Sequence, residues 1–96
     1  MISEIQKETL LKYLGPIKPL KIAIFGSYAR GENKEGSDLD ILVHLDYTYP
    51  VSLLKLVSIE QSISDALGLA VDIVTEKSLS PHLRPFIEKD LHYILE

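Results

Sequence analysis

Cysteine is absent from the 96-residue sequence. Without thiols the protein cannot use thiolate catalysis, cysteine-ligated zinc or disulfide bonds, and this fits a reducing compartment. Long apolar runs are missing as well, since none approaches the roughly 18 residues that span a membrane. The opening residues, Met-Ile-Ser-Glu, lack the basic and apolar regions of a secretory signal. We therefore expect a cytoplasmic protein that does not bind a membrane.

Positive charge is also scarce, because 10 lysine and arginine residues face 14 aspartate and glutamate residues, for a formal net charge of -4. This balance opposes attraction to phosphate backbones, so we do not expect long DNA or RNA as a partner. A nucleotide stays compatible, because metal ions and a few local donors can neutralise its phosphates. The length and the hydrophobic content of 46% predict a single domain over residues 1–96.

Apolar periodicity predicts two long helices. Residues 2–14 carry a loose helical stripe, and Gly15-Pro16 should end that helix. Apolar residues recur at spacings of three and four over residues 53–67, where Gly68 should cap a second helix.

Three segments read as strands, namely residues 21–25, 38–44 and 70–75. Near the C-terminus, Ser80-Pro81 predicts the start of a final helix that fades near Asp90. Residues 91–95 could continue that helix or form a short edge strand.

Three aspartates are candidates for a metal site. Asp38 and Asp40 are two residues apart on an expected strand, so both carboxylates should project from the same side. Such a pair repels itself unless a cation lies between, and hard oxygen ligands favour magnesium or manganese. Asp72 lies between valine and isoleucine, where a charge is costly unless it is solvated, paired or metal-bound. Each could instead be an ordinary solvated strand or turn residue.

The segment after the first expected strand is a candidate phosphate site. Gly26 permits a sharp turn there, and the backbone N–H groups with the Ser27 hydroxyl can point at a phosphate. The same dipeptide could be an ordinary strand-to-helix turn with Ser27 as N-cap. Arg30, one helical turn later, could reach the phosphates or an acceptor, or it could be a solvated or ion-paired surface residue.

Gly26-Ser27, ten intervening residues and then Asp38-Leu39-Asp40 match the G-S-x10-D-x-D signature of the DNA polymerase β-like nucleotidyltransferases. Four fixed positions should match a chain this short only about once in a thousand. The flanking residues resemble the minimal nucleotidyltransferase family, and the resemblance covers nearly the whole chain. It implies an α/β fold with a small mixed β-sheet and helices packed on one face.

The resemblance also implies a mechanism with two Mg²⁺ ions, or Mn²⁺, and ATP as the substrate. Asp38 and Asp40 would hold metals that bridge the nucleotide phosphates. Asp72 would ligate the catalytic metal and help deprotonate the acceptor hydroxyl. Gly26 and Ser27 would hold the β- and γ-phosphates.

Similar minimal nucleotidyltransferases are antitoxins that transfer AMP to a tyrosine of a HEPN-family RNase toxin, so the resemblance implies this activity and this partner. Two other functions stay open from the sequence. The domain could be a non-catalytic module that binds a nucleotide or the toxin, or it could adenylylate a small molecule or an RNA end.

Overall fold

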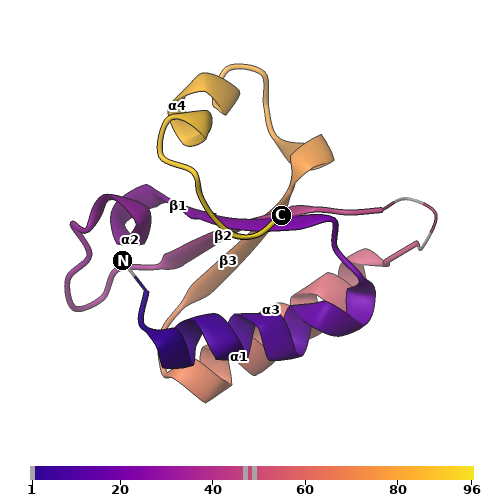
Figure 1. Cartoon of the computed structure of the whole chain (residues 1–96), viewed down its shortest axis with the longest axis horizontal. Coiled ribbons are helices and arrows are strands. Elements are labelled where there is room, and N and C mark those ends of the chain that lie inside the picture. The colour runs from indigo at the N-terminus through magenta and orange to yellow at the C-terminus, as the bar shows by residue number, and fades with distance from the viewer. Residues whose placement is uncertain (1, 47, 49) are drawn as a thin grey trace.

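The computed structural model describes residues 2–46, 48 and 50–96. Its helices are α1 (Glu4–Leu14), the 3-10 turn η1 (Gly15–Ile17), α2 (Gly26–Arg30), α3 (Leu53–Leu67), the 3-10 turn η2 (Glu76–Ser78) and α4 (Arg84–Glu88). Its strands are β1 (Lys21–Phe25), β2 (Leu39–His44), β3 (Val71–Thr75) and β4 (His92–Leu95). As predicted, the long helices α1 and α3 pack on one face of the sheet, while the short α4 lies on the other side (Figure 1).

The four strands form one mixed sheet in the order β3-β2-β1-β4. β1 is antiparallel to both β2 and β4, whereas β2 is parallel to β3. A parallel pair needs a long crossover, and α3 supplies it between β2 and β3. Of the two alternatives for residues 91–95, a continued helix or a short edge strand, the structure shows the strand, because His92–Leu95 form β4 at the edge of the sheet.

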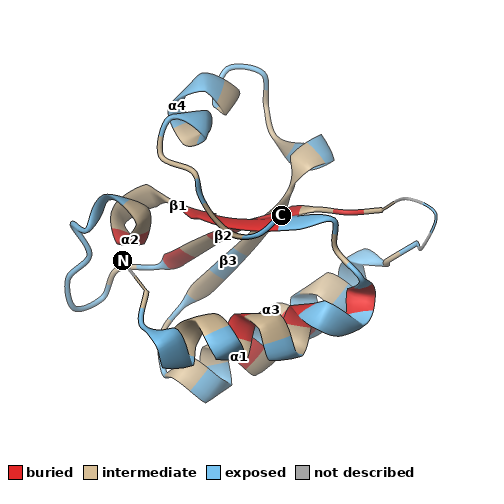
Figure 2. Cartoon of the chain, in the orientation of Figure 1, coloured by how far each residue is buried: buried red, intermediate tan, exposed pale blue. Residues whose placement is uncertain are grey.

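The hydrophobic core lies between the sheet and the two long helices (Figure 2). Leu39, Ile41 and Val43 of β2 are fully buried in it, as are Leu10 of α1 and Ile63 of α3. Because side chains alternate along a strand, the even-numbered residues of β2 project from the opposite face of the sheet. That second face carries the polar residues of the site.

The ends of the long helices follow from their capping residues. Ser3 and Gln6 form a capping box, in which the Gln6 backbone N–H donates to Ser3 Oγ at 3.1 Å. The first helix therefore begins at Glu4 and not at the predicted residue 2. It ends at Leu14 as predicted, although Gly15 keeps a right-handed conformation and leads into η1. Gly68 caps α3 in the left-handed conformation that the sequence predicts.

The last helix is shorter than predicted and begins later. Ser80 Oγ accepts a hydrogen bond from the His82 backbone N–H at 3.2 Å, so Ser80-Pro81 opens a turn and not a helix. The helix begins at Arg84, with Pro85 in its first turn. Proline lacks a backbone N–H, and an N–H in the first turn of a helix has no intrahelical acceptor, so no hydrogen bond is lost. It ends at Glu88, two residues before the predicted end.

In the described residues, no helix combines the length and the apolar character needed to cross a membrane.

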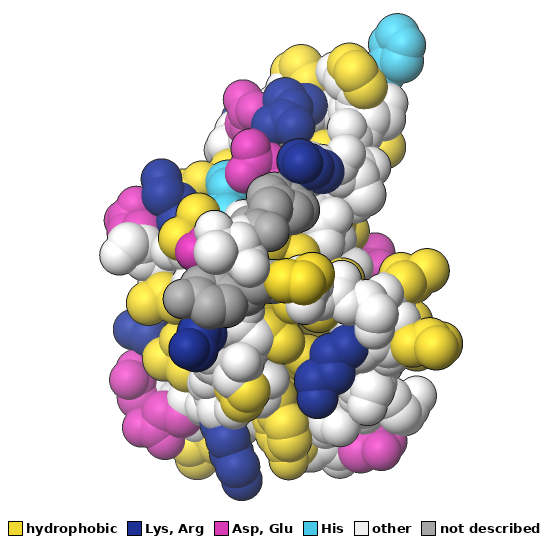
Figure 3. Space-filling view, turned by 90° about the vertical axis from the view of Figure 1, so that its right-hand side faces the viewer, with side chains coloured by type: hydrophobic (Ala, Val, Ile, Leu, Met, Phe, Trp, Pro, Cys, Tyr) yellow, Lys and Arg dark blue, Asp and Glu magenta, His cyan; other side chains and the backbone are white. Residues whose placement is uncertain are grey.

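The end of the molecule seen on the right in Figure 1 exposes hydrophobic side chains interspersed with basic ones (Figure 3). It includes the first turn of α3, where Leu53 and Leu54 are exposed. The aspartates of the site lie at the opposite end, where β2 and β3 begin (Figure 1).

Candidate active site

Two of the three candidate aspartates lie side by side on neighbouring strands. Asp40 of β2 and Asp72 of β3 are register partners in the parallel pair. Parallel partners project from the same face of a sheet, and here this is the face turned away from α1 and α3, because Leu39 and Ile41 point into the core. Asp40 is half-buried and Asp72 is exposed. The register thus brings together two carboxylates that are far apart in the sequence.

Asp38 lies one residue before β2, so the strand begins later than predicted. Its side chain is exposed, and its charge acts on Asp40. Burial, then Asp72 and then Asp38 raise the pKa of Asp40 to about 6, while the positive charge of Arg30 lowers it. The three carboxylates therefore form one electrostatic cluster, in which Asp40 is the most strongly affected.

The turn after β1 lies directly against this cluster. Gly26 adopts a left-handed conformation with φ of 73°, and a Cβ atom at this position would collide with Oδ2 of Asp40. The preceding residue, Phe25, is the register partner of Asp40 on β1. Ser27 follows in the first turn of α2 and is half-buried. Only glycine satisfies both the backbone conformation and the close approach to the carboxylate.

The donor set suits a hard divalent cation that is shared with a substrate. In the part of the chain that the structure describes, no three histidine, cysteine, aspartate or glutamate side chains converge closely enough to hold a metal by themselves. Mg²⁺ does not require such a cage, because it commonly binds one or two carboxylates together with phosphate oxygens. Asp40 and Asp72 offer carboxylate oxygens from adjacent strands, and a cation would relieve the repulsion that raises the pKa of Asp40.

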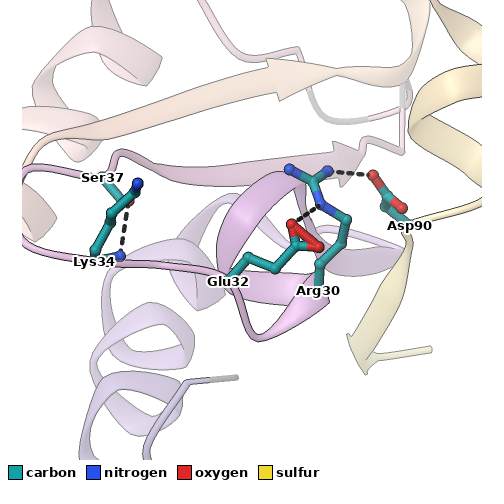
Figure 4. Close-up of polar contacts among 5 residues, drawn as sticks. All are labelled: Arg30, Glu32, Lys34, Ser37 and Asp90. Atoms are coloured by element: carbon teal, nitrogen blue, oxygen red, sulfur yellow. Dashed lines mark hydrogen bonds and ion pairs between the residues drawn. The ribbon is translucent and has the colours of Figure 1, made fainter.

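Arg30, at the end of α2, is ion-paired (Figure 4). Its Nη1 donates to Oδ2 of Asp90 at 2.7 Å, and its Nε donates to Oε2 of Glu32 at 3.4 Å. The hydrogen bond that Arg30 donates to Asp90 is the main cause that raises the pKa of Arg30. Asp90 could not be predicted as part of this region, because it lies 60 residues from Arg30 and in no recognisable motif.

Comparisons with known proteins show the family of the chain. The family model described as a nucleotidyltransferase domain matches residues 3–94. A protein of Methanocaldococcus jannaschii, provisionally named a protein adenylyltransferase, is 50% identical over an alignment of 98 positions that covers 97% of each chain. The protein adenylyltransferase MntA of Thermococcus cleftensis is 42% identical over 74 positions, which cover 77% of this chain and 73% of the relative.

Solved structures share the fold as well. The chain resembles one chain of a crystal structure described as a toxin-antitoxin with AMP-PNP, with a TM-score of 0.78 and 26% identity. The match covers 92% of this chain and 71% of that one. A further structure, provisionally described as a minimal nucleotidyltransferase, is 33% identical with a TM-score of 0.77, over 92% of this chain and 88% of the other. The chain belongs to the nucleotidyltransferase domain family.

Proposed function

We propose that this protein transfers AMP from ATP to a hydroxyl group of a partner protein, with Asp38, Asp40 and Asp72 as its catalytic residues. The observation that carries the proposal is the placement of Asp40 beside Asp72 on one sheet face, directly against the turn at Gly26. Family membership supports nucleotidyl transfer, and relatives named as protein adenylyltransferases support AMP and a protein acceptor.

The nucleotide is bound through the turn that follows β1. Gly26 and Ser27 hold the β- and γ-phosphates, because a turn between a strand and a helix presents backbone N–H groups to an anion. The Ser27 hydroxyl adds a side-chain donor. Arg30, three residues further on, supplies a positive charge at the edge of the same site. ATP as the substrate is supported by the similar structure that is described as containing AMP-PNP.

Asp38, Asp40 and Asp72 would hold two Mg²⁺ ions, or Mn²⁺. The ions would supply positive charge that stabilises the negative charge developing in the reaction. The acceptor oxygen forms a bond to the α-phosphorus, the bond from that phosphorus to the bridging oxygen breaks, and pyrophosphate leaves. Asp72 helps to remove the proton of the acceptor hydroxyl, and its exposure leaves room for a large acceptor to approach.

The acceptor is a tyrosine of a HEPN-family RNase toxin, and the protein acts as the antitoxin in the cytoplasm. The similar toxin-antitoxin structure supports this biological setting. The negative net charge of -4 argues against long DNA or RNA as the acceptor.

Incubation with ATP and Mg²⁺, with and without the co-purified partner, tests the proposal through intact-mass measurement. We expect the partner to gain one or more AMP units, and Asp40→Asn to prevent this gain. Inhibition of the partner without any change in its mass would show a binding module in place of an enzyme. Release of pyrophosphate only with a small molecule or tRNA would assign a different acceptor.

A further inference from the structure

An ion pair joins the turn of the proposed site to the C-terminal part of the chain. Arg30 Nη1 lies 2.7 Å from Oδ2 of Asp90, which is a charge-assisted hydrogen bond of good length. The Asp90 side chain is only 14% exposed, whereas that of Arg30 is 43% exposed. The two side chains reach toward each other from α2 and from the segment after α4 (Figure 4). A half-exposed arginine is thus held by a carboxylate that is itself largely shielded from water.

Asp90 is fixed on both sides along the chain. Its backbone N–H donates to the Ile87 carbonyl oxygen at 3.0 Å, which ties it to the last turn of α4. Two residues later, His92 begins β4 and pairs with Ile24 of β1. β1 leads directly into Gly26. The carboxylate of Asp90 therefore has a defined position relative to the phosphate-binding turn.

The guanidinium that Asp90 holds lies close to the acidic cluster. The positive charge of Arg30 is one of the causes that act on the pKa of Asp40, together with Asp72 and Asp38. The helix that carries Arg30 begins at Gly26, whose backbone lies against Oδ2 of Asp40. Asp90 contacts the guanidinium directly, through Nη1.

Arg30 retains donors for a further ligand. A guanidinium carries five N–H donors in a planar fork, and the ion pairs with Asp90 and Glu32 engage Nη1 and Nε. Holding a long arginine side chain in one orientation costs rotamer entropy. Because the fixed carboxylate already holds the side chain in the free protein, less entropy is lost when the nucleotide binds, and this pre-organisation increases affinity.

We propose that Asp90 is a positioning residue, which orients the guanidinium of Arg30 at the edge of the acidic cluster so that its remaining N–H groups meet the triphosphate of ATP. This inference rests on the proposed function, in which Arg30 serves the nucleotide. It assigns to the C-terminal segment a part in nucleotide binding that none of the sequence motifs contains.

Direct binding of AMP-PNP with Mg²⁺, measured by calorimetry on the full chain, separates this role from a purely structural one. We expect Asp90→Asn to weaken binding about five- to twenty-fold, since a charge-assisted hydrogen bond that positions the ligand contact is lost. Arg30→Ala should weaken it at least as much, and the double variant should be no weaker than Arg30→Ala alone. Asp90→Glu, which keeps the carboxylate, should restore part of the affinity.

A matched control is Glu88→Gln on α4, which removes an exposed ion pair with Arg84 at 3.4 Å and should leave nucleotide affinity unchanged. If Asp90→Asn lowers the melting temperature but binds the nucleotide like the wild type, Asp90 is only structural and the inference is wrong. Tighter binding by Asp90→Asn also overturns it, because Asp90 would then compete with the phosphates for Arg30.

Failure of the proposed function gives a different result. If the wild-type protein does not bind AMP-PNP with Mg²⁺ at all, both the proposed function and this inference are wrong. If the wild type binds and Asp90→Asn binds equally well, only the inference is wrong. In transfer assays, Asp90→Asn should raise the KM for ATP far more than it lowers kcat, because the acceptor-activating aspartates are unchanged.

Discussion

Asp40 and Asp72 are register partners on the parallel strands β2 and β3. The register places two carboxylates from separate segments on the same sheet face. Half-burial of Asp40, and then the negative charge of Asp72, raise the pKa of Asp40. A cation that binds between two such carboxylates relieves their repulsion, and it can bind a phosphate oxygen at the same time.

Replacing the carboxylates by amides should abolish AMP transfer without unfolding the protein. Asp38→Asn, Asp40→Asn and Asp72→Asn keep the size of each side chain but remove the charge that holds metal and phosphate. We expect losses of at least about 10²- to 10³-fold in the transfer rate, the range found when one charge-stabilising group is removed. The far-ultraviolet circular dichroism should stay unchanged, because none of the three lies in the hydrophobic core.

Asp65→Asn is the matched control for that series. Asp65 is an exposed acid on α3 whose side chain accepts a hydrogen bond from Gln61 at 2.9 Å. Its replacement removes one exposed negative charge from α3, which packs on the sheet face opposite to that of the site, so transfer should continue at the wild-type rate. Full activity in Asp40→Asn would contradict the assigned mechanism.

Gly26→Ala should destabilise the protein more than Gly68→Ala does. Both glycines are left-handed, with φ of 73° and 69°, so alanine costs about 1–2 kcal/mol of backbone strain at either position. At Gly68 a Cβ atom meets nothing within 4 Å, whereas at Gly26 it collides with the Asp40 carboxylate. We expect a further cost of about 1–3 kcal/mol at Gly26 from this overpacking. Urea denaturation of both variants measures the difference, and equal losses would show that Asp40 moves aside freely.

The pH dependence of stability should carry the signature of Asp40. Its pKa is raised in the folded protein from the ordinary 3.8 to about 6, so the folded state binds the proton more tightly than the unfolded state does. In the absence of divalent metal, the contribution of Asp40 to the free energy of unfolding should therefore be most favourable at low pH. It should fall as the pH rises from about 4 to about 6.

Asp40→Asn removes this titration and should melt above the wild type at neutral pH in EDTA, by on the order of a few degrees. The advantage should shrink as the pH falls toward 4, because the wild-type carboxyl group then becomes neutral as well. Calorimetric melting of both proteins between pH 4 and 8 measures the two curves. A gap that is independent of pH would show that burial and the neighbouring carboxylates do not raise the pKa of Asp40.

Much of the fold follows from local patterns in the sequence. The spacing of leucine and isoleucine predicts α3 together with its cap at Gly68, because a helix stripe and a left-handed glycine are local features. The D-x-D spacing predicts that Asp38 and Asp40 share a face, although Asp38 lies just outside the strand. Residue roles at the site remain predictions, since they concern substrate and metal.

Other features depend on contacts that no local pattern encodes. Ser80-Pro81 and Arg84-Pro85 both place a proline near a possible helix start, and the sequence pattern does not show that the first opens a turn and the second a helix. The pairing of Arg30 with Asp90 spans 60 residues. It depends on β4 returning beside β1, which the sequence left undecided between helix and strand.

Glu60 should determine how firmly β3 is held beside Asp72. β3 is one of the two outer strands of the sheet, and the Ile73 backbone N–H donates to Oε2 of Glu60 on α3 at 2.8 Å in a partly buried position. Removing the acceptor leaves this N–H without its partner, which costs about 1–3 kcal/mol where water has limited access. Because Ile73 directly follows Asp72, Glu60→Ala should loosen the strand at the point where the carboxylate is positioned.

Amide hydrogen exchange at Ile73 measures this effect directly. Exchange should speed up markedly in Glu60→Ala and only slightly in Glu60→Gln, because the amide oxygen can still accept the hydrogen bond. Gln61→Ala, the neighbouring exposed position on α3, should leave the exchange at Ile73 unchanged. Unaltered exchange in Glu60→Ala would mean that pairing with β2 alone holds β3 in place, and that α3 contributes only its apolar contacts to the position of Asp72.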